Sequence, residues 1–227
     1  MKSAVSVIAA SSALLGVASA SVQGFDISNY QGNIDWSGAY NSGARFVIIK
    51  ATEGTDYIDS GFNSHYTGAT NAGFIRGGYH FAHPDSSSGA DQANYFLAHG
   101  GGWSADGITL PGMLDIEYAP SGNECYGLSA SDMVSWITDF VNTYESATGR
   151  YPMIYSTNDW WSTCTGNSDA FSSNSPLVLA DYNSSPGTIP GGWPYQTIWQ
   201  NSDSYAYGGD SDVFNGDETA LKKIASG

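Results

Sequence analysis

The stretch Met113-Leu114-Asp115-Ile116-Glu117-Tyr118 follows a Pro-Gly turn and has the apolar pattern of a short buried strand. In a strand, positions i and i+2 point to the same face, so Asp115 and Glu117 are expected about 6.6 Å apart along one wall. A buried charge without a partner costs several kcal/mol, and catalysis is one reason to keep both carboxylates there. The alternative is an edge strand whose polar face contacts water.

Similar β-rich runs recur on both sides of this stretch, with helical or loop segments between them. This alternation predicts parallel strands joined by crossovers. Eight runs are the number expected for a small α/β barrel. The predicted strands cover 24–28, 45–51, 75–81, 113–117, 152–156, 177–182, 197–200 and 212–214.

Helical patterns lie between the early strands and fade after Tyr151. The predicted helices cover 59–72, 88–99 and 131–146, and in the last one apolar residues recur every three or four positions. Beyond Tyr151 only a weak helical pattern at 159–161 and a final helix over 218–225 remain, between connections rich in Gly, Pro, Ser and Asn. The helical layer is therefore expected to be incomplete on this side of the barrel.

The first 20 residues predict a secretory signal peptide. Lys2 precedes an apolar run that ends in small residues at Ala18-Ser19-Ala20, and the run is too short to span a membrane. We therefore expect a secreted, extracellular protein. Residues 21–227 contain no linker or repeat and are predicted to form a single catalytic domain, which we expect to be a monomer.

The charge of the chain argues against two classes of partner. Without Lys2, six basic residues face 22 acidic ones, which gives a net charge of −16. Nucleic acids and anionic membranes need clustered Lys and Arg, so neither is expected as a partner. The simplest meaning of this acidity is the solubility of a secreted protein.

Two cysteines, Cys125 and Cys164, predict one disulfide in an oxidising compartment. Closing the loop between them would stabilise the fold by about 4 kcal/mol in the chain-entropy model. One glycosylation sequon is present at Asn183-Ser184-Ser185, although Pro186 just beyond it weakens the case for modification.

In a parallel barrel, functional side chains gather at the carboxyl ends of the strands. The acidic residues at these predicted ends are Asp26, Asp115, Glu117, Asp181 and Asp212. Aromatic residues gather at the same ends: Tyr30, Tyr79, Tyr118, Tyr155, Tyr182 and Trp199. Sugars place their C–H faces on aromatic rings while carboxylates and amides bond their hydroxyls, so the pattern favours a carbohydrate groove, although aromatic rings also plug barrel ends.

Other chemistries fit the sequence less well. His80 and His83 could approach a metal ion, but their spacing is not a usual zinc pattern, and His80 is as easily a hydrogen-bonded residue at a strand end. No nucleophile elbow, Walker loop or dinucleotide-binding motif follows a predicted strand. We expect no metal and no cofactor.

Several motifs, in order along nearly all of residues 21–227, resemble those of glycoside hydrolase family 25, the N,O-diacetylmuramidase lysozymes. These motifs are Phe25-Asp26-Ile27-Ser28, Tyr30-Gln31-Gly32, Ile49-Lys50-Ala51-Thr52-Glu53-Gly54, Gly78-Tyr79-His80-Phe81, Leu114-Asp115-Ile116-Glu117, Tyr155-Ser156, Ala180-Asp181-Tyr182, Ile198-Trp199-Gln200 and Asp212-Val213-Phe214-Asn215-Gly216. The series of linked motifs is far more specific than the two carboxylates alone.

The resemblance implies a modified TIM-like α/β barrel of the (β/α)5(β)3 type. It also implies a lysozyme that hydrolyses, with retention, the β-1,4 bond between N-acetylmuramic acid and N-acetylglucosamine in bacterial peptidoglycan. Glu117 would be the general acid and then the general base, with Asp26, Asp115 and Asp212 as the other active-site acids. The expected substrate-binding residues are Tyr79, Tyr118, Tyr155, Asp181, Tyr182 and Trp199.

The residues permit two routes for the second step. Either a carboxylate attacks the anomeric carbon, or the N-acetyl oxygen of the substrate does so, and the resemblance favours the second route with Asp115 orienting the acetamido group. In both routes the charge of Asp115 and the apolar walls raise the pKa of Glu117, which suits a proton donor.

Two alternatives remain for the function. A chitin-type hydrolase would usually carry a D-x-x-D-x-D-x-E run, which would require aspartates at the positions of Leu110 and Met113. A non-catalytic saccharide-binding module would need the aromatic residues but not the convergence of acids at the strand ends.

Overall fold

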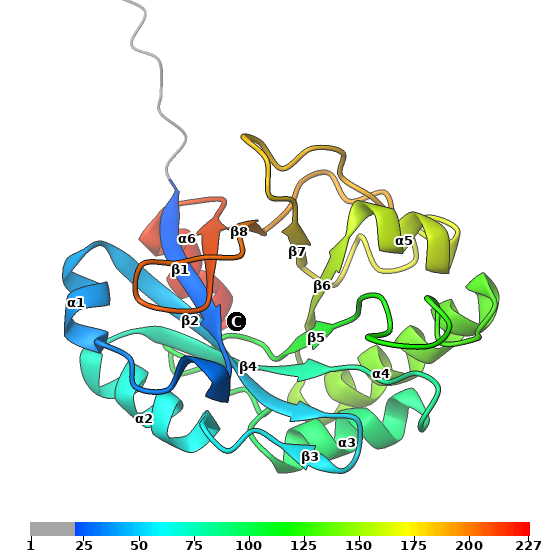
Figure 1. The fold of residues 1–227 in the computed structure, drawn as a ribbon, viewed down its shortest axis with the longest axis horizontal. Coiled ribbons are helices and arrows are strands. Elements are labelled where there is room, and N and C mark those ends of the chain that lie inside the picture. The colour runs from blue at the N-terminus through cyan, green and yellow to red at the C-terminus, as the bar shows by residue number, and fades with distance from the viewer. Residues whose placement is uncertain (1–20) are drawn as a thin grey trace, which may run out of the picture.

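The computed structural model describes residues 21–227, so the predicted signal peptide over 1–20 lies outside the described residues. Nine strands occur in the described part of the chain: β1 (Val22–Ile27), β2 (Ala44–Glu53), β3 (Tyr57–Ile58), β4 (Ile75–Phe81), β5 (Met113–Asp115), β6 (Met153–Thr157), β7 (Leu177–Ala180), β8 (Ile198–Ser202) and β9 (Asp210–Phe214). They form one sheet in the order β1-β9-β8-β7-β6-β5-β4-β2-β3, and a further pairing of β1 with β2 closes it into an eight-stranded barrel (Figure 1). The short β3 pairs only with β2, outside the ring.

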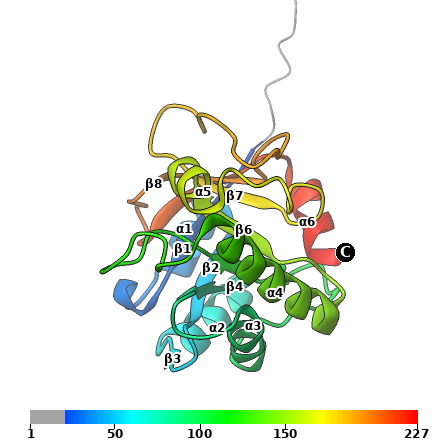
Figure 2. The ribbon, with the colours of Figure 1, turned by 90° about the vertical axis from the view of Figure 1, so that its right-hand side faces the viewer.

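The order of the helices confirms the predicted barrel type. The helices are α1 (Trp36–Asn41), α2 (Phe62–Ala72), α3 (Gly89–Ala98), α4 (Ala130–Thr148), α5 (Asn158–Thr165) and α6 (Glu218–Ser226). The first five follow β1, β2–β3, β4, β5 and β6 in turn, whereas the segment from β7 to β9 has none. Figure 2 shows α3 and α4 side by side against the barrel, and a long loop without a helix between β7 and β8. The fold is therefore a modified TIM-like (β/α)5(β)3 barrel.

One strand of the ring runs in the opposite direction to the other seven. Each neighbouring pair from β1 through β2, β4, β5, β6, β7 and β8 is parallel. By contrast, β9 runs antiparallel to both β8 and β1. The first residue of β9 thus lies at the end of the barrel where the other seven strands have their carboxyl ends.

Local sequence explains where the long helix α4 begins and ends. The Ser129 side chain accepts a hydrogen bond from the backbone of Asp132, a cap that stabilises a helix by about 1 kcal/mol. The helix stops at Gly149, whose φ of 71° is easy only for a residue without a side chain. Its apolar stripe is buried against the barrel: Met133, Trp136, Ile137, Phe140, Val141 and Tyr144.

Alternating strand residues build two separate apolar layers. In β5, Met113 belongs to the cluster inside the barrel, while Leu114 belongs to the larger cluster between the barrel and the helices. Leu221 and Ala225 of α6 join the inner cluster, so α6 closes the amino end of the barrel. The carboxyl end stays available for a site. Among residues 21–227, the helices are all too short or too polar to cross a membrane.

The predicted disulfide joins Cys125 to Cys164, with their Cα atoms 5.3 Å apart. Cys125 lies in the loop between β5 and α4, and Cys164 lies in α5. The bond therefore anchors the loop that begins just after the Asp115–Glu117 pair to the neighbouring helix.

Candidate active site

A cavity of about 200 Å³ opens at the carboxyl ends of the parallel strands. Its charged lining residues are the carboxylates Asp26, Asp115, Glu117 and Asp210 and one cation, Lys50. A second hollow of about 350 Å³ is lined by Asp181 and Tyr182, and it shares Glu117 and Tyr155 with the first. Glu117 and Tyr155 thus stand at the boundary of two adjoining hollows, which together form the candidate active site.

Asp115 and Glu117 face the same cavity, as the two-residue period of the strand requires. Asp115 is the last residue of β5. The next residue, Ile116, still donates its backbone N–H to the carbonyl of Tyr155 at 3.1 Å, so the extended path continues past the end of the strand. Ile116 itself packs into the outer apolar layer. This alternation turns the Glu117 side chain back toward the cavity.

The two carboxyls differ in their surroundings. Burial, followed by the charges of Glu117 and Asp26, raises the pKa of Asp115 well above its ordinary value, and Oδ1 of Asp115 has no hydrogen-bond partner among residues 21–227. Burial also raises the pKa of Glu117, and there the Lys50 charge, which lowers the pKa of both groups, is the second-largest influence. Asp115 thus lies buried inside the wall, whereas Glu117 is more exposed and borders both hollows.

The Gln200 side chain connects two tyrosines to two carboxylates. Its Oε1 accepts hydrogen bonds from the hydroxyls of Tyr155 at 2.9 Å and Tyr182 at 2.8 Å. Its Nε2 donates to Oδ2 of Asp26 at 2.7 Å and to Oδ2 of Asp210 at 3.3 Å. These four contacts fix the orientation of the amide, because only its oxygen can accept and only its nitrogen can donate.

Asp26 and Asp212 form a second carboxyl pair beneath the cavity. Burial and then the charge of Asp210 raise the pKa of Asp26 to about 7, although Gln200 partly offsets them. Asp212 is 1% exposed, and an ionised Asp212 would have no donor for either oxygen among the described residues. Burial and the charge of Asp26 raise its pKa well above the ordinary value, and a hydrogen bond between the two carboxyls favours a protonated Asp212. Asp212 therefore acts as the neutral donor of the pair.

The structure places Asp210, not Asp212, in the lining of the cavity. Asp210 is the first residue of β9 and pairs in register with Asp26, while Asp212 pairs with Gly24, deeper in the barrel. Gly209 makes this approach possible, since its φ is 73° and a side chain there would collide with the Asp26 carbonyl. Asp212 was expected in the site from the family resemblance, and the strand was predicted to begin there, whereas β9 begins at Asp210.

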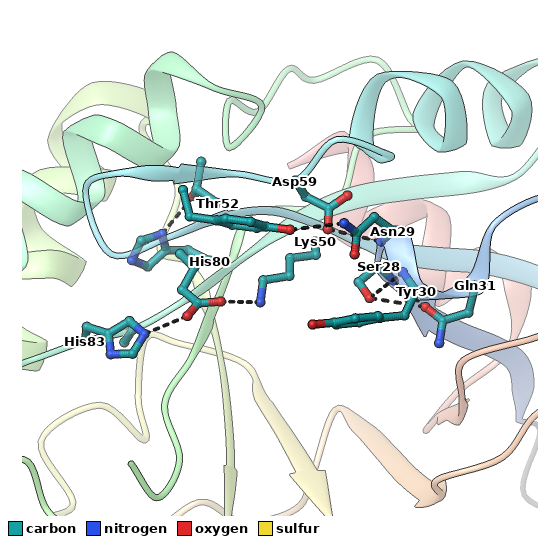
Figure 3. A network of polar contacts seen from close by, with 12 residues as sticks. Ser28, Asn29, Tyr30, Gln31, Lys50, Thr52, Asp59, His80 and His83 are labelled. Carbon is teal, nitrogen blue, oxygen red and sulfur yellow. Dashed lines mark hydrogen bonds and ion pairs between the residues drawn. The ribbon is translucent and has the colours of Figure 1, made fainter. Parts of the chain in front are cut away.

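Lys50 belongs to a chain of ionic contacts that leads from the cavity toward the surface. Its ammonium lies 2.6 Å from Oε2 of Glu53, and Oε1 of Glu53 lies 2.8 Å from Nε2 of His83. Figure 3 shows Lys50 and His83 on either side of this carboxylate. Burial alone would raise the pKa of Glu53, but the hydrogen bonds from Lys50 and His83 outweigh it and lower that pKa. Glu53 is therefore a stable anion that holds Lys50 in place.

His80 has a structural place between β4 and α3. Its Nδ1 lies 2.8 Å from the Thr52 hydroxyl and its Nε2 lies 2.9 Å from Oε1 of Gln92, so both ring nitrogens have partners. Burial lowers the pKa of His80 to about 4, which keeps the ring neutral. In the part of the chain that the structure describes, no three His, Cys, Asp or Glu side chains are grouped to hold a metal ion.

The expected substrate-binding residues divide into two groups. Tyr79 and Tyr155 line the first hollow, and Tyr155, Asp181 and Tyr182 line the second. Tyr118 and Trp199 line neither hollow. Tyr118 follows Glu117 and Trp199 precedes Gln200, and because these neighbours point into the cavity, the two aromatic side chains point away from it. The Tyr118 hydroxyl donates to Asp159 of α5 at 2.7 Å, and the Trp199 indole donates to the Asp181 carbonyl at 2.7 Å.

Sequence reasoning did not assign roles to Lys50, Gln200 or Asp210. Lys50 and Gln200 occur in the family motifs without an expected role. Both point inward, because they share a strand face with the apolar residues Ile48 and Ile198 of the inner cluster. The two-residue period could have found them. The direction of β9 determines that Asp210 lies nearer the cavity than Asp212. The sequence of one short strand does not indicate its direction.

Comparison with known sequences decides the family. The sequence model described as Glycosyl hydrolases family 25 matches residues 25–210. The chain belongs to this family. Membership confirms the resemblance seen in the motifs and makes the protein a glycoside hydrolase.

Individual relatives extend over nearly the whole described chain. An N,O-diacetylmuramidase from Chalaropsis sp. is 64% identical over 210 residues, which are 91% of this chain and 100% of that protein. An N,O-diacetylmuramidase from Arthroderma benhamiae is 61% identical over 220 residues, 97% of this chain and 93% of the other. The structure of a family 25 lysozyme from Aspergillus fumigatus superimposes with a TM-score of 0.90 at 64% identity, over 91% of this chain and 100% of that one. The barrel is therefore the fold of family 25 lysozymes.

Proposed function

We propose that this glycoside hydrolase is a secreted lysozyme that hydrolyses the β-1,4 bond between N-acetylmuramic acid and N-acetylglucosamine in bacterial peptidoglycan, with retention of configuration. One observation carries the proposal: Glu117 borders both hollows of the candidate active site, with the buried Asp115 beside it in the wall. A sugar on either side of Glu117 would place the bond between them next to its carboxyl group. The muramidase names of the relatives from Chalaropsis sp. and Arthroderma benhamiae support the substrate.

Glu117 supplies the proton in the first step. Burial raises its pKa, so the carboxyl keeps a proton that it can donate to the glycosidic oxygen as the bond to the anomeric carbon breaks. The leaving sugar departs as an alcohol, and Glu117 becomes a carboxylate. Lys50, which lines the same cavity, stabilises this new negative charge.

Asp115 orients the internal nucleophile. The acetamido oxygen of the substrate attacks the anomeric carbon and forms a cyclic oxazolinium ion, whose N–H donates a hydrogen bond to a carboxyl oxygen of Asp115. Water then attacks the same carbon while Glu117 takes up its proton, which restores the enzyme. Two displacements at one carbon give net retention.

Asp26, Asp210 and Gln200 complete the opposite wall. Nε2 of Gln200 donates to Asp26 and Asp210, so the two carboxyls keep a fixed distance from the reacting centre. The partial negative charge on their carboxyl oxygens favours the positive charge that develops on the sugar ring in the transition state. Tyr155 and Tyr182 bind the amide oxygen from the other side and border the second hollow, where a sugar ring would stack.

Analysis of the products of purified peptidoglycan tests the proposal. After reduction of the fragments, mass spectrometry should find muramitol at the new ends, because hydrolysis on the proposed side exposes the anomeric carbon of muramic acid. New ends that carry reduced glucosamine, or faster hydrolysis of chitin than of peptidoglycan, would contradict it. Proton NMR of the first product should show the β-anomer if configuration is retained, and the α-anomer would exclude the proposed route.

The domain limits and the location are part of the same proposal. We infer that residues 1–20 are removed on secretion and that 21–227 form the catalytic domain. Amino-terminal sequencing of the protein from culture medium should begin at Ser21. Retention in the cell with an intact amino terminus would contradict secretion.

A further inference from the structure

Two adjoining hollows lie at the end of the barrel opposite the candidate active site. Their volumes are about 250 and 370 Å³, and both are lined by Tyr195, Thr197 and Ile224. Thr197 directly precedes β8, and Asn215 directly follows the antiparallel β9, so both lie at the amino ends of the parallel strands. We name the two hollows together the amino-end groove; its lining includes Arg150, Trp193, Tyr195, Asn215 and Lys223.

The composition of the amino-end groove suits a sugar. The Tyr195 side chain is 57% exposed, so its ring is open to a ligand in the groove. Trp193 is buried beneath, with its indole nitrogen bonded to the Ser175 carbonyl at 2.8 Å. Asn215 and Thr197 add amide and hydroxyl groups at the edge. An exposed aromatic ring can stack on the C–H face of a hexose while neutral hydrogen-bonding groups beside it bond the sugar hydroxyls.

The positive charge of the protein is concentrated at the same end. Three of the six basic residues of 21–227 are within ion-pair distance of a carboxylate: Arg45 with Glu218, Lys50 with Glu53 and Arg76 with Asp106. Among the described residues, the remaining three, Arg150, Lys222 and Lys223, have no such partner within 4.0 Å. Arg150 and Lys223 line the groove, and Arg150 also lies over the Trp103 ring at 5.2 Å.

This distribution of charge makes the two ends of the barrel differ in how they interact with an anionic ligand. The candidate active site gathers four carboxylates, and the chain as a whole is strongly acidic. An anionic polymer is therefore repelled by most of the surface, but salt screens such repulsion beyond about 8 Å, so unpaired cations act on a ligand that touches them. The amino-end groove is where an anionic chain meets an aromatic ring and unpaired cations together.

We propose that the amino-end groove is a second, non-catalytic binding site for peptidoglycan glycan whose peptide stems carry carboxylate groups. Tyr195 stacks on a sugar ring, and Arg150 and Lys223 bind the carboxylates. The site holds the enzyme on the insoluble wall while the opposite end cleaves a strand. The identity of the polymer rests on the proposed function.

Binding to insoluble peptidoglycan tests the proposal, with Glu117→Gln as the parent protein so that the wall stays intact. Lys223→Glu should weaken binding about tenfold, since it replaces an attraction by a repulsion, and Tyr195→Ala should weaken it about fivefold. The matched control is Lys222→Glu, the same charge reversal one residue earlier on α6 and outside the groove lining. It should bind within about twofold of the parent. Equal weakening by Lys222→Glu, or wild-type binding by both groove variants, would overturn the proposal.

Two further measurements separate this inference from the proposed function. Raising the salt concentration from about 0.02 M to about 0.5 M should shrink the difference between Lys223→Glu and the parent, because the lost contact is ionic; an unchanged difference would overturn the assigned role of Lys223. Melting temperatures close to that of the parent are expected for all three variants, since the replaced side chains are exposed. If soluble peptidoglycan fragments resist the wild-type enzyme while the groove variants lose wall binding, the proposed function fails and the second site stands.

Discussion

The ammonium of Lys50 lies 2.6 Å from a carboxylate oxygen of Glu53, and it also lines a cavity with four carboxyl groups. Glu53 is fixed from its other side by His83, so Lys50 is held as the single cation lining that cavity within residues 21–227. Its charge lowers the pKa values of Asp115 and Glu117, against the effect of burial. Protonation of this candidate pair is therefore set by burial and neighbouring carboxylates, which raise both pKa values, against one lysine, which lowers them.

Replacing Lys50 by Met should move the alkaline limb of the rate–pH profile upward by about 0.5–1 unit. A general acid works only while it is protonated, and removal of a nearby positive charge raises the pKa at which Glu117 loses its proton. The measurement is kcat against pH on soluble peptidoglycan fragments. Lys50→Arg keeps the charge and should leave the limb near its wild-type position. A limb that moves downward in Lys50→Met would contradict this account.

Glu117→Gln should lower kcat by about a thousandfold while the melting temperature stays near that of the wild type. The amide has nearly the same shape but cannot donate the proton or accept one from water. Glu124→Gln is the matched control, since Glu124 is exposed in the same loop and lines neither hollow. Near-normal hydrolysis by Glu117→Gln would remove Glu117 from the mechanism.

Asp115→Asn should lower kcat by about 100-fold with a smaller effect on KM. The substitution removes the carboxylate that orients the acetamido group and stabilises the cyclic ion. A thiazoline analogue of that ion, which copies its ring, should inhibit the wild type and bind Asp115→Asn much more weakly. Turnover within a few-fold of wild type would argue against an orienting role for Asp115.

The buried pair Asp26 and Asp212 should make the fold less stable as the pH rises from about 4 to about 7. Unfolded aspartates ionise near 3.8, whereas burial keeps Asp26 protonated up to about 7 and Asp212 protonated well above its ordinary range. As the pH rises, the unfolded state therefore releases these protons before the folded state does. The stability that the protonated pair gives the fold is fully present below pH 3.8 and is lost as the pH rises through the pKa of the folded protein.

Asp212→Asn tests this linkage, since the amide needs no proton to remain buried and neutral. The free energy of unfolding at pH 7 should rise by about 1 kcal/mol or more, and its slope between pH 4 and 7 should become shallower. Urea unfolding at a series of pH values measures both. A variant with the wild-type slope would show that Asp212 is not protonated in the folded protein.

Removing the disulfide by Cys125→Ser with Cys164→Ser should lower the free energy of unfolding by about 4 kcal/mol. Catalysis should fall as well, because the bond anchors the loop that starts after Glu117 to α5. Thermal unfolding and kcat at 25 °C, well below the melting transition, report the two effects separately. Unchanged kcat in the folded double variant would show that Glu117 is positioned by β5 alone.

Most of the barrel was predictable because its strands and longer helices carry strong periodic patterns. The strand at 75–81 was predicted with its observed limits, Ile75–Phe81, and the helix predicted at 131–146 extends over Ala130–Thr148. Two short elements were not predicted. α1 (Trp36–Asn41) has only six residues and contains Gly38, and β3 has two residues, too few for any period to register.

The candidate site was predictable where a two-residue period applies and not where chain direction matters. Asp115 and Glu117 share one wall as expected, whereas Tyr118 and Trp199, one residue from an inward neighbour, point elsewhere. Asp210 was missed because it lay outside the strand predicted at 212–214, whereas β9 begins with it and runs antiparallel to its neighbours. A sequence gives the spacing within a strand, but the pairing that reverses β9 depends on contacts between distant parts of the chain.

The strand β9 also connects the two ends of the barrel at a fixed distance. Its first residue, Asp210, lines the cavity of the candidate active site, and Asn215, directly beyond its last residue, lines the amino-end groove. Five residues of strand fix the separation at about 17 Å, through the middle of the protein. One straight glycan cannot follow that path, so an enzyme held at both ends would grip two different strands of the wall. Such an enzyme would remain close to uncut bonds after each cleavage. The lifetime of its bound state at the second site, more than diffusion, would determine how many bonds it cleaves in one region of the wall.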